Sequence, residues 1–149
     1  AEMPIRETTP QSPINPYGWS KLLSAYMLRD FAAQSPQFAY AALRYFNVAG
    51  SSADGTIVED HDPETHLIPV ILQAALGKRE KITVFGEDYA TPDGTCIRDY
   101  IHVEDLVEAH IRVMEALAPG DKRVYNLGIG TGYSVKQIID AVKKAAARR

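Results

Sequence analysis

The sequence predicts an α/β fold with a parallel sheet, and two observations support this. Segments with strand patterns and helix patterns alternate along the chain, as they do where helices connect neighbouring parallel strands. Residues 38–48 read FAYAALRYFNV and are almost all apolar or aromatic, which is typical of a strand buried on both faces of a sheet. The sequence shows no internal repeat and no low-complexity segment.

The first predicted helix covers residues 16–34. Asn15 is a suitable N-cap because its side chain can accept a backbone N–H of the first turn, and Pro16 fits the first helical position. Pro36 lies just beyond the predicted end, where a proline cannot continue a helix. The apolar strand over 38–48 follows this helix.

The middle of the chain is more polar. A loop over 49–64 leads to a predicted second helix over 66–77, with Thr65 as its cap. A short strand is expected over 81–85 because this stretch alternates apolar and polar residues.

The last third contains two further strands and two helices. After a loop rich in Gly, Asp and Pro, a strand is predicted over 97–103 and another over 123–127. A helix over 104–118 has one apolar side, made of Leu106, Val107, Val113, Met114 and Leu117 with His110 beside them. The final helix begins at Ser134, with Gln137 completing a capping box. Its apolar stripe is Val135, Ile138, Ile139 and Val142.

Composition restricts the class of protein. The 149 residues are 46% hydrophobic and 23% charged, as in an ordinary globular domain. The net charge of −3 argues against a nucleic-acid surface, which needs a basic stripe. No apolar run approaches the roughly 20 residues that cross a bilayer. Cys96 is the only cysteine, which excludes an internal disulfide and fits a cytoplasmic location.

The first chemical signal is the pair Tyr17 and Lys21. At this spacing the two side chains lie one turn apart on the same face of the predicted helix. A Lys ammonium beside a tyrosine favours the phenolate, so the pair can serve as a general base. The spacing also arises often by chance, so alone it leaves an ordinary surface pair open.

Successive residues of a helix are rotated by about 100° around its axis, and at this rotation the same helix has two apolar sides. One side carries Tyr17, Lys21, Ser24, Ala25, Leu28 and Phe31, and the opposite side carries Trp19, Leu22, Leu23 and Tyr26. A surface helix of a monomer normally has only one apolar side. The second side therefore predicts a partner such as another subunit.

Four motifs follow one another along the chain. They are Asn15-Pro-Tyr-Gly-x-Ser-Lys21, Arg44-Tyr-Phe-Asn-Val-Ala-Gly50, Phe85-Gly-x-Asp-Tyr-x-Thr-x-Asp-Gly-Thr-x-x-Arg-Asp-Tyr-Ile-His-Val103 and Tyr125-Asn-Leu-Gly-x-Gly-x-Gly132. Together they resemble the UDP-glucose 4-epimerase family of the extended short-chain dehydrogenase/reductase superfamily. The second motif has the epimerase form rather than the Asn-x-Tyr-Gly-Pro ending of dehydratase relatives.

The resemblance implies an isomerase that uses NAD to interconvert UDP-glucose and UDP-galactose. Tyr17 would take the proton of the sugar 4-hydroxyl while the hydride passes to NAD, and the 4-keto intermediate would turn over before reduction on its other face. Lys21 would bind the nicotinamide ribose and favour the phenolate. Tyr45 and Phe46 match further cofactor-binding positions.

Arg98 is the strongest candidate for a diphosphate ligand, because a guanidinium offers a bidentate fork to phosphate oxygens. The alternative is a salt bridge to Asp99 or Glu104. The resemblance places further residues near the UDP-sugar: Asn47, His66, Leu67, Thr83, Phe85 and Tyr100. For Phe85 and Leu67, core packing is the alternative interpretation.

Two other patterns indicate no cofactor or metal site. The glycines from Gly128 to Gly132 follow a strand and precede a helix, but Tyr133 stands where a dinucleotide fingerprint needs its third glycine, so we interpret them as a tight turn. His61 and His66 lie in an acidic loop with Glu59, Asp60 and Asp62, but their spacing matches no standard zinc motif. We therefore predict no metal site.

The resemblance also refines the predicted fold to the C-terminal part of a parallel Rossmann-type sheet plus most of a smaller sugar-nucleotide lobe. Residues 1–48 would hold the catalytic helix and following strand of a truncated Rossmann-type domain, and residues 49–149 mainly the substrate-binding lobe with interleaved Rossmann elements. No glycine-rich pyrophosphate turn precedes Tyr17. We expect a fragment that lacks the N-terminal NAD-binding half and a C-terminal segment, and that is inactive alone.

The family further implies a homodimer built around the Tyr17 helix. Two alternative functions stay open: another sugar-nucleotide dehydratase, decarboxylase or epimerase of the superfamily, and a non-catalytic module on a degenerate epimerase scaffold. The presence of both Tyr17 and Lys21 argues against the second. Acceptance of N-acetylated UDP-sugars is left open.

Overall fold

The computed structural model describes residues 3–147, and the chain divides into two compact units. Unit 1 comprises the chain up to Tyr45 together with Asp105–Leu127. Unit 2 comprises Phe46–Glu104 together with the chain from Gly128 onward. The chain thus leaves unit 1, returns to it, and leaves it again.

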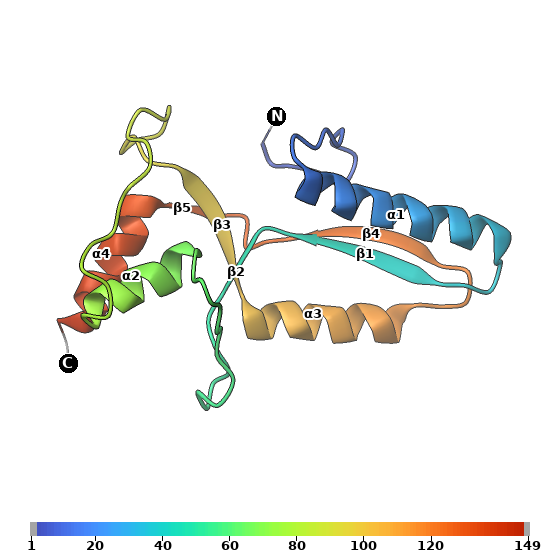
Figure 1. The fold of residues 1–149 in the computed structure, drawn as a ribbon. Helices are drawn as coiled ribbons and strands as arrows, with labels where there is room; N and C mark the ends of the chain where they lie inside the picture. Colours follow the sequence, from blue (N-terminus) through green and yellow to red (C-terminus); the bar gives the residue numbers. More distant parts are fainter. Residues whose placement is uncertain (1–2, 148–149) are drawn as a thin grey trace. The chain divides into compact units, whose positions relative to one another are not determined.

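Unit 1 is a pair of parallel strands with a helix on each side (Figure 1). Its elements are α1 (Pro16–Gln34), β1 (Tyr40–Tyr45), most of α3 (Val103–Ala116) and β4 (Lys122–Leu127). The two strands pair in register from Tyr40 opposite Lys122 to Tyr45 opposite Leu127. Leu22 and Ala32 of α1 and Leu106 of α3 are buried. The α/β class and the parallel pairing that the sequence predicts are confirmed.

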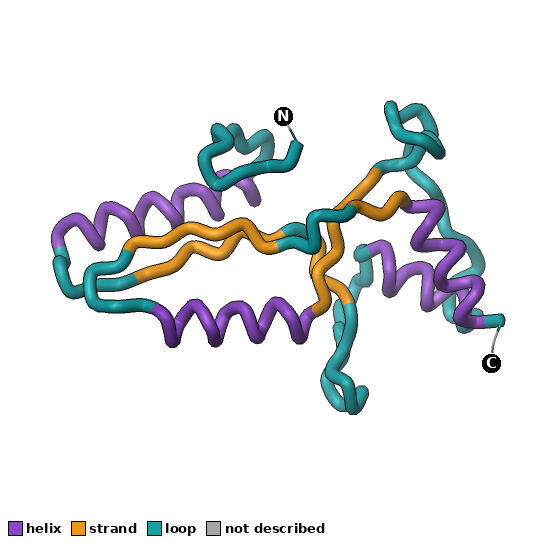
Figure 2. Tube along the Cα trace, turned by 180° about the vertical axis from the view of Figure 1, so that it is seen from behind, coloured by secondary structure: helices purple, strands orange, loops and turns teal. Residues whose placement is uncertain are grey.

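Unit 2 is a three-stranded mixed sheet with two helices. Its elements are β2 (Asn47–Ala49), α2 (Leu67–Ala75), β3 (Ile97–His102), β5 (Gly132–Ser134) and α4 (Val135–Ala146). The central strand β3 pairs with β2 in parallel and with β5 antiparallel. The helices α2 and α4 lie side by side, as both views show (Figure 2). Ile71 and Ile101 are buried.

Two of the three helix starts that were predicted from capping residues are confirmed. The helix α1 begins at Pro16, and the Asn15 side-chain oxygen accepts the N–H of Gly18 at 2.8 Å. At the start of α4, the Ser134 hydroxyl accepts the N–H of Gln137, and the Gln137 side chain accepts the N–H of Ser134. The four residues of the predicted α4 stripe are half-buried.

The apolar run over 38–48 forms two strands rather than the single strand predicted. β1 ends at Tyr45 and pairs with β4, whereas β2 begins at Asn47 and pairs with β3. The first of them, β1, is also only half-buried, and its last residue, Tyr45, is 48% exposed. An apolar pattern indicates extended chain but carries no signal for a change of pairing partner.

Two local predictions are wrong, and one short strand was not predicted. Residues 81–85 are irregular, since among the described strands none pairs with them. His66 rather than Thr65 is the N-cap residue of α2, since the helix begins at Leu67, and the Glu64 carboxylate accepts the N–H groups of Thr65 and His66 at 2.7 Å each. The short strand β5 was missed.

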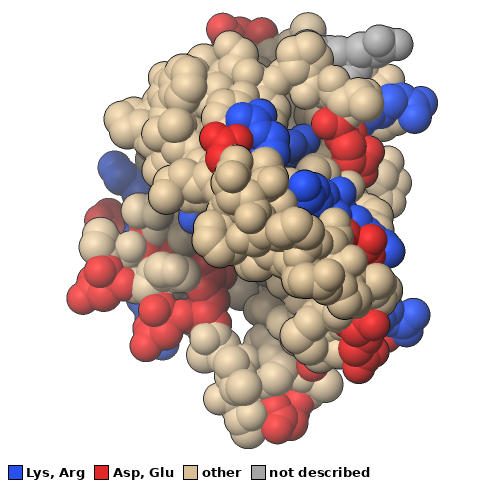
Figure 3. All heavy atoms as spheres, turned by 90° about the vertical axis from the view of Figure 1, so that its right-hand side faces the viewer, with Lys and Arg blue, Asp and Glu red and all other residues tan. Residues whose placement is uncertain are grey.

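The described surface carries mixed charge. On the face shown in Figure 3, Lys and Arg side chains lie beside Asp and Glu side chains, and uncharged residues cover most of the area. Within residues 3–147, no helix is both long enough and apolar enough to span a bilayer.

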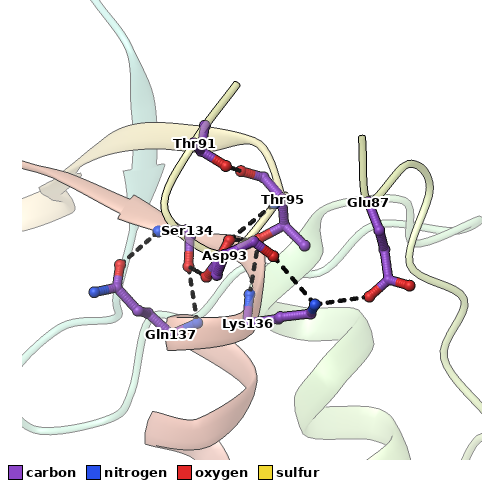
Figure 4. A network of polar contacts seen from close by, with 7 residues as sticks. All are labelled: Glu87, Thr91, Asp93, Thr95, Ser134, Lys136 and Gln137. Atoms are coloured by element: carbon purple, nitrogen blue, oxygen red, sulfur yellow. Dashed lines mark hydrogen bonds and ion pairs between the residues drawn. The ribbon is translucent and has the colours of Figure 1, made fainter. Parts of the chain in front are cut away.

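A hydrogen-bonded network joins the loop before β3 to the start of α4 (Figure 4). Thr95 is fully buried, and its hydroxyl donates to the Asp93 carboxylate at 2.7 Å. The other carboxylate oxygen of Asp93 accepts the Ser134 hydroxyl, and this bond is the largest cause that lowers the pKa of Asp93. Lys136 donates to the Asp93 carbonyl and pairs with Glu87 at 2.8 Å. The network therefore fixes the loop that leads into β3.

We predict that Thr95→Val lowers the free energy of unfolding by about 1–3 kcal/mol, because the buried hydroxyl that donates to Asp93 and accepts the N–H of Lys136 is lost. Chemical denaturation followed by circular dichroism measures this. Thr65→Val is the matched control, since the Thr65 side chain is exposed and does not cap α2. Equal unfolding free energies for the two variants would contradict the role of the network.

Candidate functional site

The N-terminus of α1 holds the predicted catalytic pair. Asn15 fixes the first turn, and Pro16 occupies the first helical position. A Cβ at position 18 would lie 3.2 Å from the Pro13 side chain and 3.3 Å from the Asn15 side-chain oxygen, so glycine is favoured there. The residue before it, Tyr17, is thereby held in a capped and closely packed first turn.

Tyr17 and Lys21 are brought together as predicted. The Lys21 Nζ lies 5.3 Å from the centroid of the Tyr17 ring, and the tyrosine is 72% exposed. A cation at this distance from an aromatic ring is attracted to it. The pair is therefore accessible to a ligand and has the groups for proton transfer.

The loop before α1 is tied to the carboxyl ends of β1 and β4, which sequence reasoning did not predict. The Arg44 guanidinium donates to the Glu7 carbonyl and to the Gln11 side chain at 3.1 Å each. The Glu7 carboxylate accepts the backbone N–H of Asn126 at 2.8 Å, which is the largest cause that lowers the pKa of Glu7. Arg44 lies in one of the four motifs, and this is its structural role.

The other two predicted cofactor-contact residues, Tyr45 and Phe46, fall in different units. Tyr45 ends β1 in unit 1, where its ring meets the His110 ring edge-on at 6.0 Å between centroids. Both side chains line a groove of about 430 Å³ between β1 and α3. Phe46 belongs to unit 2 and is 42% exposed.

The predicted apolar side of α3 is correct only in part, since Leu106 is buried but Val107 is half-exposed.

Most of the predicted substrate-binding residues lie in unit 2. Asn47 of β2 stands opposite Tyr100 of β3 in the parallel ladder. Burial raises the pKa of Tyr100, and the nearby Arg98 opposes this rise. Arg98 itself is exposed on β3. These three residues therefore share one small sheet.

The alternative role of Arg98, a salt bridge to Asp99 or Glu104, is not what the structure has. Asp99 accepts the N–H groups of Ile129 and Gly130 at 3.1 and 3.0 Å. Glu104 accepts the N–H of Ala53 at 2.7 Å. In the described part of the chain, the Arg98 guanidinium makes no ion pair, so its donors are available to an anion.

The other predicted substrate contacts differ in burial. Phe85 is 85% exposed and Thr83 is exposed, so core packing does not explain Phe85. Leu67 is half-buried as the first residue of α2. His66 is exposed at the N-cap position of the same helix.

A group of four donor side chains surrounds His66, which we call the histidine–carboxylate cluster: Glu59, His61, Glu64 and His66. Their ligand atoms all lie within 4.8 Å of one another. The sequence prediction of no metal site rested on the spacing along the chain and on the solvated charge of the loop, and Glu64 was not among the residues considered. The convergence comes from the folding of the loop and carries no spacing signature.

The glycines from Gly128 to Gly132 form a turn closed on the Asp99 carboxylate. A Cβ at position 128 would lie 2.7 Å from a carboxylate oxygen of Asp99, and one at position 132 would lie 2.3 Å from Ile97. Since two N–H groups of the turn already donate to Asp99, they are not free to hold a pyrophosphate. This agrees with the interpretation as a tight turn. Asp99 was missed because its partners are 30 and 31 positions away in sequence.

Comparison with known proteins then identifies the family. The model of the NAD dependent epimerase/dehydratase family matches residues 1–128. The chain belongs to this family. The resemblance inferred from the four motifs is thus confirmed.

Several relatives in the family are similar over nearly the whole chain. The UDP-glucose 4-epimerase of Streptococcus mutans is 50% identical over 149 residues, which are 99% of this chain and 44% of that protein. The Rhizobium meliloti UDP-glucose 4-epimerase is 49% identical over 147 residues, 98% of this chain and 44% of that protein. The chain therefore spans less than half the length of these relatives.

Solved epimerase structures share the fold. The Bifidobacterium longum UDP-glucose 4-epimerase in complex with NAD+ and UDP has a TM-score of 0.91 and 43% identity, over 98% of this chain and 44% of that one. The Brucella ovis enzyme in complex with NAD has a TM-score of 0.88 and 47% identity, over 97% and 44% of the two chains. The predicted Rossmann-like α/β architecture is confirmed by these matches.

Proposed function

We propose that this chain supplies the proton-transfer pair and sugar-nucleotide-binding groups of an enzyme that interconverts UDP-glucose and UDP-galactose by 4-epimerisation. The observation that carries the proposal is the Tyr17–Lys21 pair, an exposed phenol with an ammonium nitrogen 5.3 Å from its ring centroid. The names of the relatives point to the same reaction. The activity is that of a protein of the relatives' full length, and the 149-residue chain alone is expected to be inactive.

In this proposal Tyr17 is the general base and acid. Its phenolate oxygen takes the proton of the sugar 4-hydroxyl as a 4-keto sugar forms, and returns it when the ketone is reduced on the other face. The Lys21 ammonium stabilises the phenolate and donates to ribose hydroxyl groups. Bound NAD would supply the hydride-accepting and hydride-donating chemistry.

The residues of the chain fit one end of such a cofactor. Tyr17 and Lys21 are exposed and polar, as contacts to a nicotinamide ribose must be, and Tyr45 and Phe46 are proposed as further contacts. The glycine-rich turn does not fit the pyrophosphate, since Asp99 occupies its N–H groups. We therefore assign to this chain the nicotinamide end alone.

For the substrate, we propose that Arg98 binds the diphosphate of the UDP-sugar. The proposal is supported by its exposed guanidinium and by the engagement of Asp99 and Glu104 elsewhere. The remaining proposed contacts are Asn47, His66, Leu67, Thr83, Phe85 and Tyr100.

In domain terms, residues 1–48 would belong to the cofactor-binding domain and residues 49–149 mainly to the substrate lobe, with Rossmann elements interleaved. The proposed setting is the cytoplasm, which suits a chain with Cys96 as its single cysteine.

We predict that Tyr17→Phe, in the enzyme of full length, lowers the turnover of UDP-galactose by roughly 10²–10⁴-fold, the range of general acid–base contributions. The bound NAD should be unchanged because Lys21 is kept. A steady-state assay and the cofactor content of the purified variant measure the two effects. Tyr40→Phe is the control, since Tyr40 begins β1, stacks on Phe38 and is outside every proposed contact. A turnover near that of the parent enzyme would refute the role of Tyr17.

We predict that Arg98→Ala weakens UDP binding by roughly 1.5–3 kcal/mol, because a charge-assisted hydrogen bond to phosphate is lost. Calorimetric titration of the full-length enzyme with UDP measures this. Arg79→Ala serves as the control because Arg79 is another exposed arginine of unit 2. If both variants bind UDP equally well, Arg98 is not a phosphate ligand.

We also propose a homodimer through α1. Leu22 is buried within unit 1, so the predicted face of four residues is reduced to Trp19, Leu23 and Tyr26, which are 50%, 52% and 41% exposed. Large apolar side chains gathered on one face favour association.

We therefore predict that Leu23→Glu converts a dimer into a monomer, because a carboxylate would be buried without a partner. Light scattering of the full-length enzyme measures the mass. Ser24→Glu adds the same charge on the other side of α1 and should leave the dimer intact. A dimer that persists in Leu23→Glu would rule this face out.

A further inference from the structure

The histidine–carboxylate cluster lies in the loop that leads into α2, and its imidazoles meet at shared oxygens. The Nδ1 atoms of His61 and His66 lie 3.2 and 3.0 Å from the same carboxylate oxygen, Oε1 of Glu59. The two rings are 4.8 Å apart between centroids. Two imidazole nitrogens thus point toward one small volume from residues five positions apart.

The fourth member, Glu64, is held in place by backbone hydrogen bonds. Its Oε1 accepts the N–H groups of Thr65 and His66 at 2.7 Å each, and its side chain is only 5% exposed. The other oxygen, Oε2, lies 4.0 Å from the His61 Nδ1. A carboxylate that is held by backbone hydrogen bonds is the kind of group that orients a metal site.

The donor set has the chemistry of a transition-metal site. Imidazole nitrogen and carboxylate oxygen are both zinc ligands, with metal–ligand distances of about 2.0–2.2 Å. Ligand atoms of a tetrahedral site with such bonds lie about 3.3 Å from one another. The nitrogen–oxygen distances in the cluster, from 2.9 to 4.0 Å, bracket this separation. Two carboxylates also neutralise the charge of a divalent cation.

We propose that the histidine–carboxylate cluster binds a divalent transition-metal ion, with Zn²⁺ as the ion that its donors fit. The site closes the loop in front of α2 and stabilises its conformation. Metal bound at Nδ1 leaves the proton of His66 on Nε2, because the two ring nitrogens have opposite roles in the neutral imidazole. An Nε2–H is the donor that a phosphate needs, and this last consequence rests on the proposed function, whereas metal binding itself does not.

The competing explanation is that the imidazoles simply donate protons to Glu59 and Glu64. The two cases differ in proton balance, because a metal binds neutral imidazole and releases any proton that it displaces. They also differ in stoichiometry, since hydrogen bonds alone create no saturable metal binding.

The test is calorimetric titration of the purified protein with ZnCl₂, in two buffers of different ionisation enthalpy at about pH 6.5, near the ordinary value for histidine. We expect one Zn²⁺ per chain, with a dissociation constant of micromolar or below and proton release on binding. His61→Ala should weaken binding at least tenfold. This variant is chosen because the His61 side chain is 54% exposed and outside the proposed substrate contacts, so the fold is retained.

The matched control is Asp60→Asn, which removes a charge from the same exposed loop without removing a member of the cluster. It should keep the affinity of the parent within twofold. Circular dichroism checks that both variants are folded. The absence of saturable binding, or equal affinities in His61→Ala and Asp60→Asn, would overturn the proposal. The absence of saturable zinc binding in a full-length enzyme that still turns over UDP-sugars would overturn this proposal and leave the proposed function intact.

Discussion

The parallel register of β1 and β4 is the constraint from which the rest of the arrangement follows. Tyr45 pairs with Leu127 at the carboxyl ends of these strands, and the next residue of each, Phe46 and Gly128, already belongs to unit 2. The chain therefore leaves unit 1 twice at the same edge of one sheet. Because Phe46 and Gly128 emerge together, they meet within unit 2, where a Cβ at position 128 would lie 3.1 Å from the Phe46 ring. In open α/β sheets this carboxyl edge is where ligands bind.

The sequence alone predicts the elements of this fold well where the determining residues are close in sequence. Asn15 with Pro16 marks the start of α1, and Ser134 with Gln137 marks the start of α4, because a cap and its helix lie within one turn. The sequence does not predict which strands pair with one another. Nothing in the apolar run over 38–48 shows that its two halves join different sheets, and β5 is too short to leave a pattern of alternation.

The same distinction between residues close in sequence and residues far apart applies to the candidate site. Tyr17 and Lys21 are one turn apart on a helix, so their proximity can be derived from the sequence. The partners of Asp99 and the members of the histidine–carboxylate cluster are brought together only by the path of loops. For Arg98 the sequence favoured a phosphate ligand and left a salt bridge as the alternative. The structure removes the second by occupying both acidic neighbours with backbone N–H groups.

The turn closed on Asp99 has a consequence for the entropy of ligand binding. In a dinucleotide fold, a glycine-rich turn presents bare N–H groups whose final partner is the phosphate of the ligand. Here the protein itself provides the anion, so the glycines lose their conformational freedom once, when the chain folds. The free energy of ligand binding therefore carries no further cost for ordering this turn. Asp99, which lies between Arg98 and Tyr100 on β3, is therefore ordered when the chain folds, before any ligand that the two proposed contacts would hold arrives.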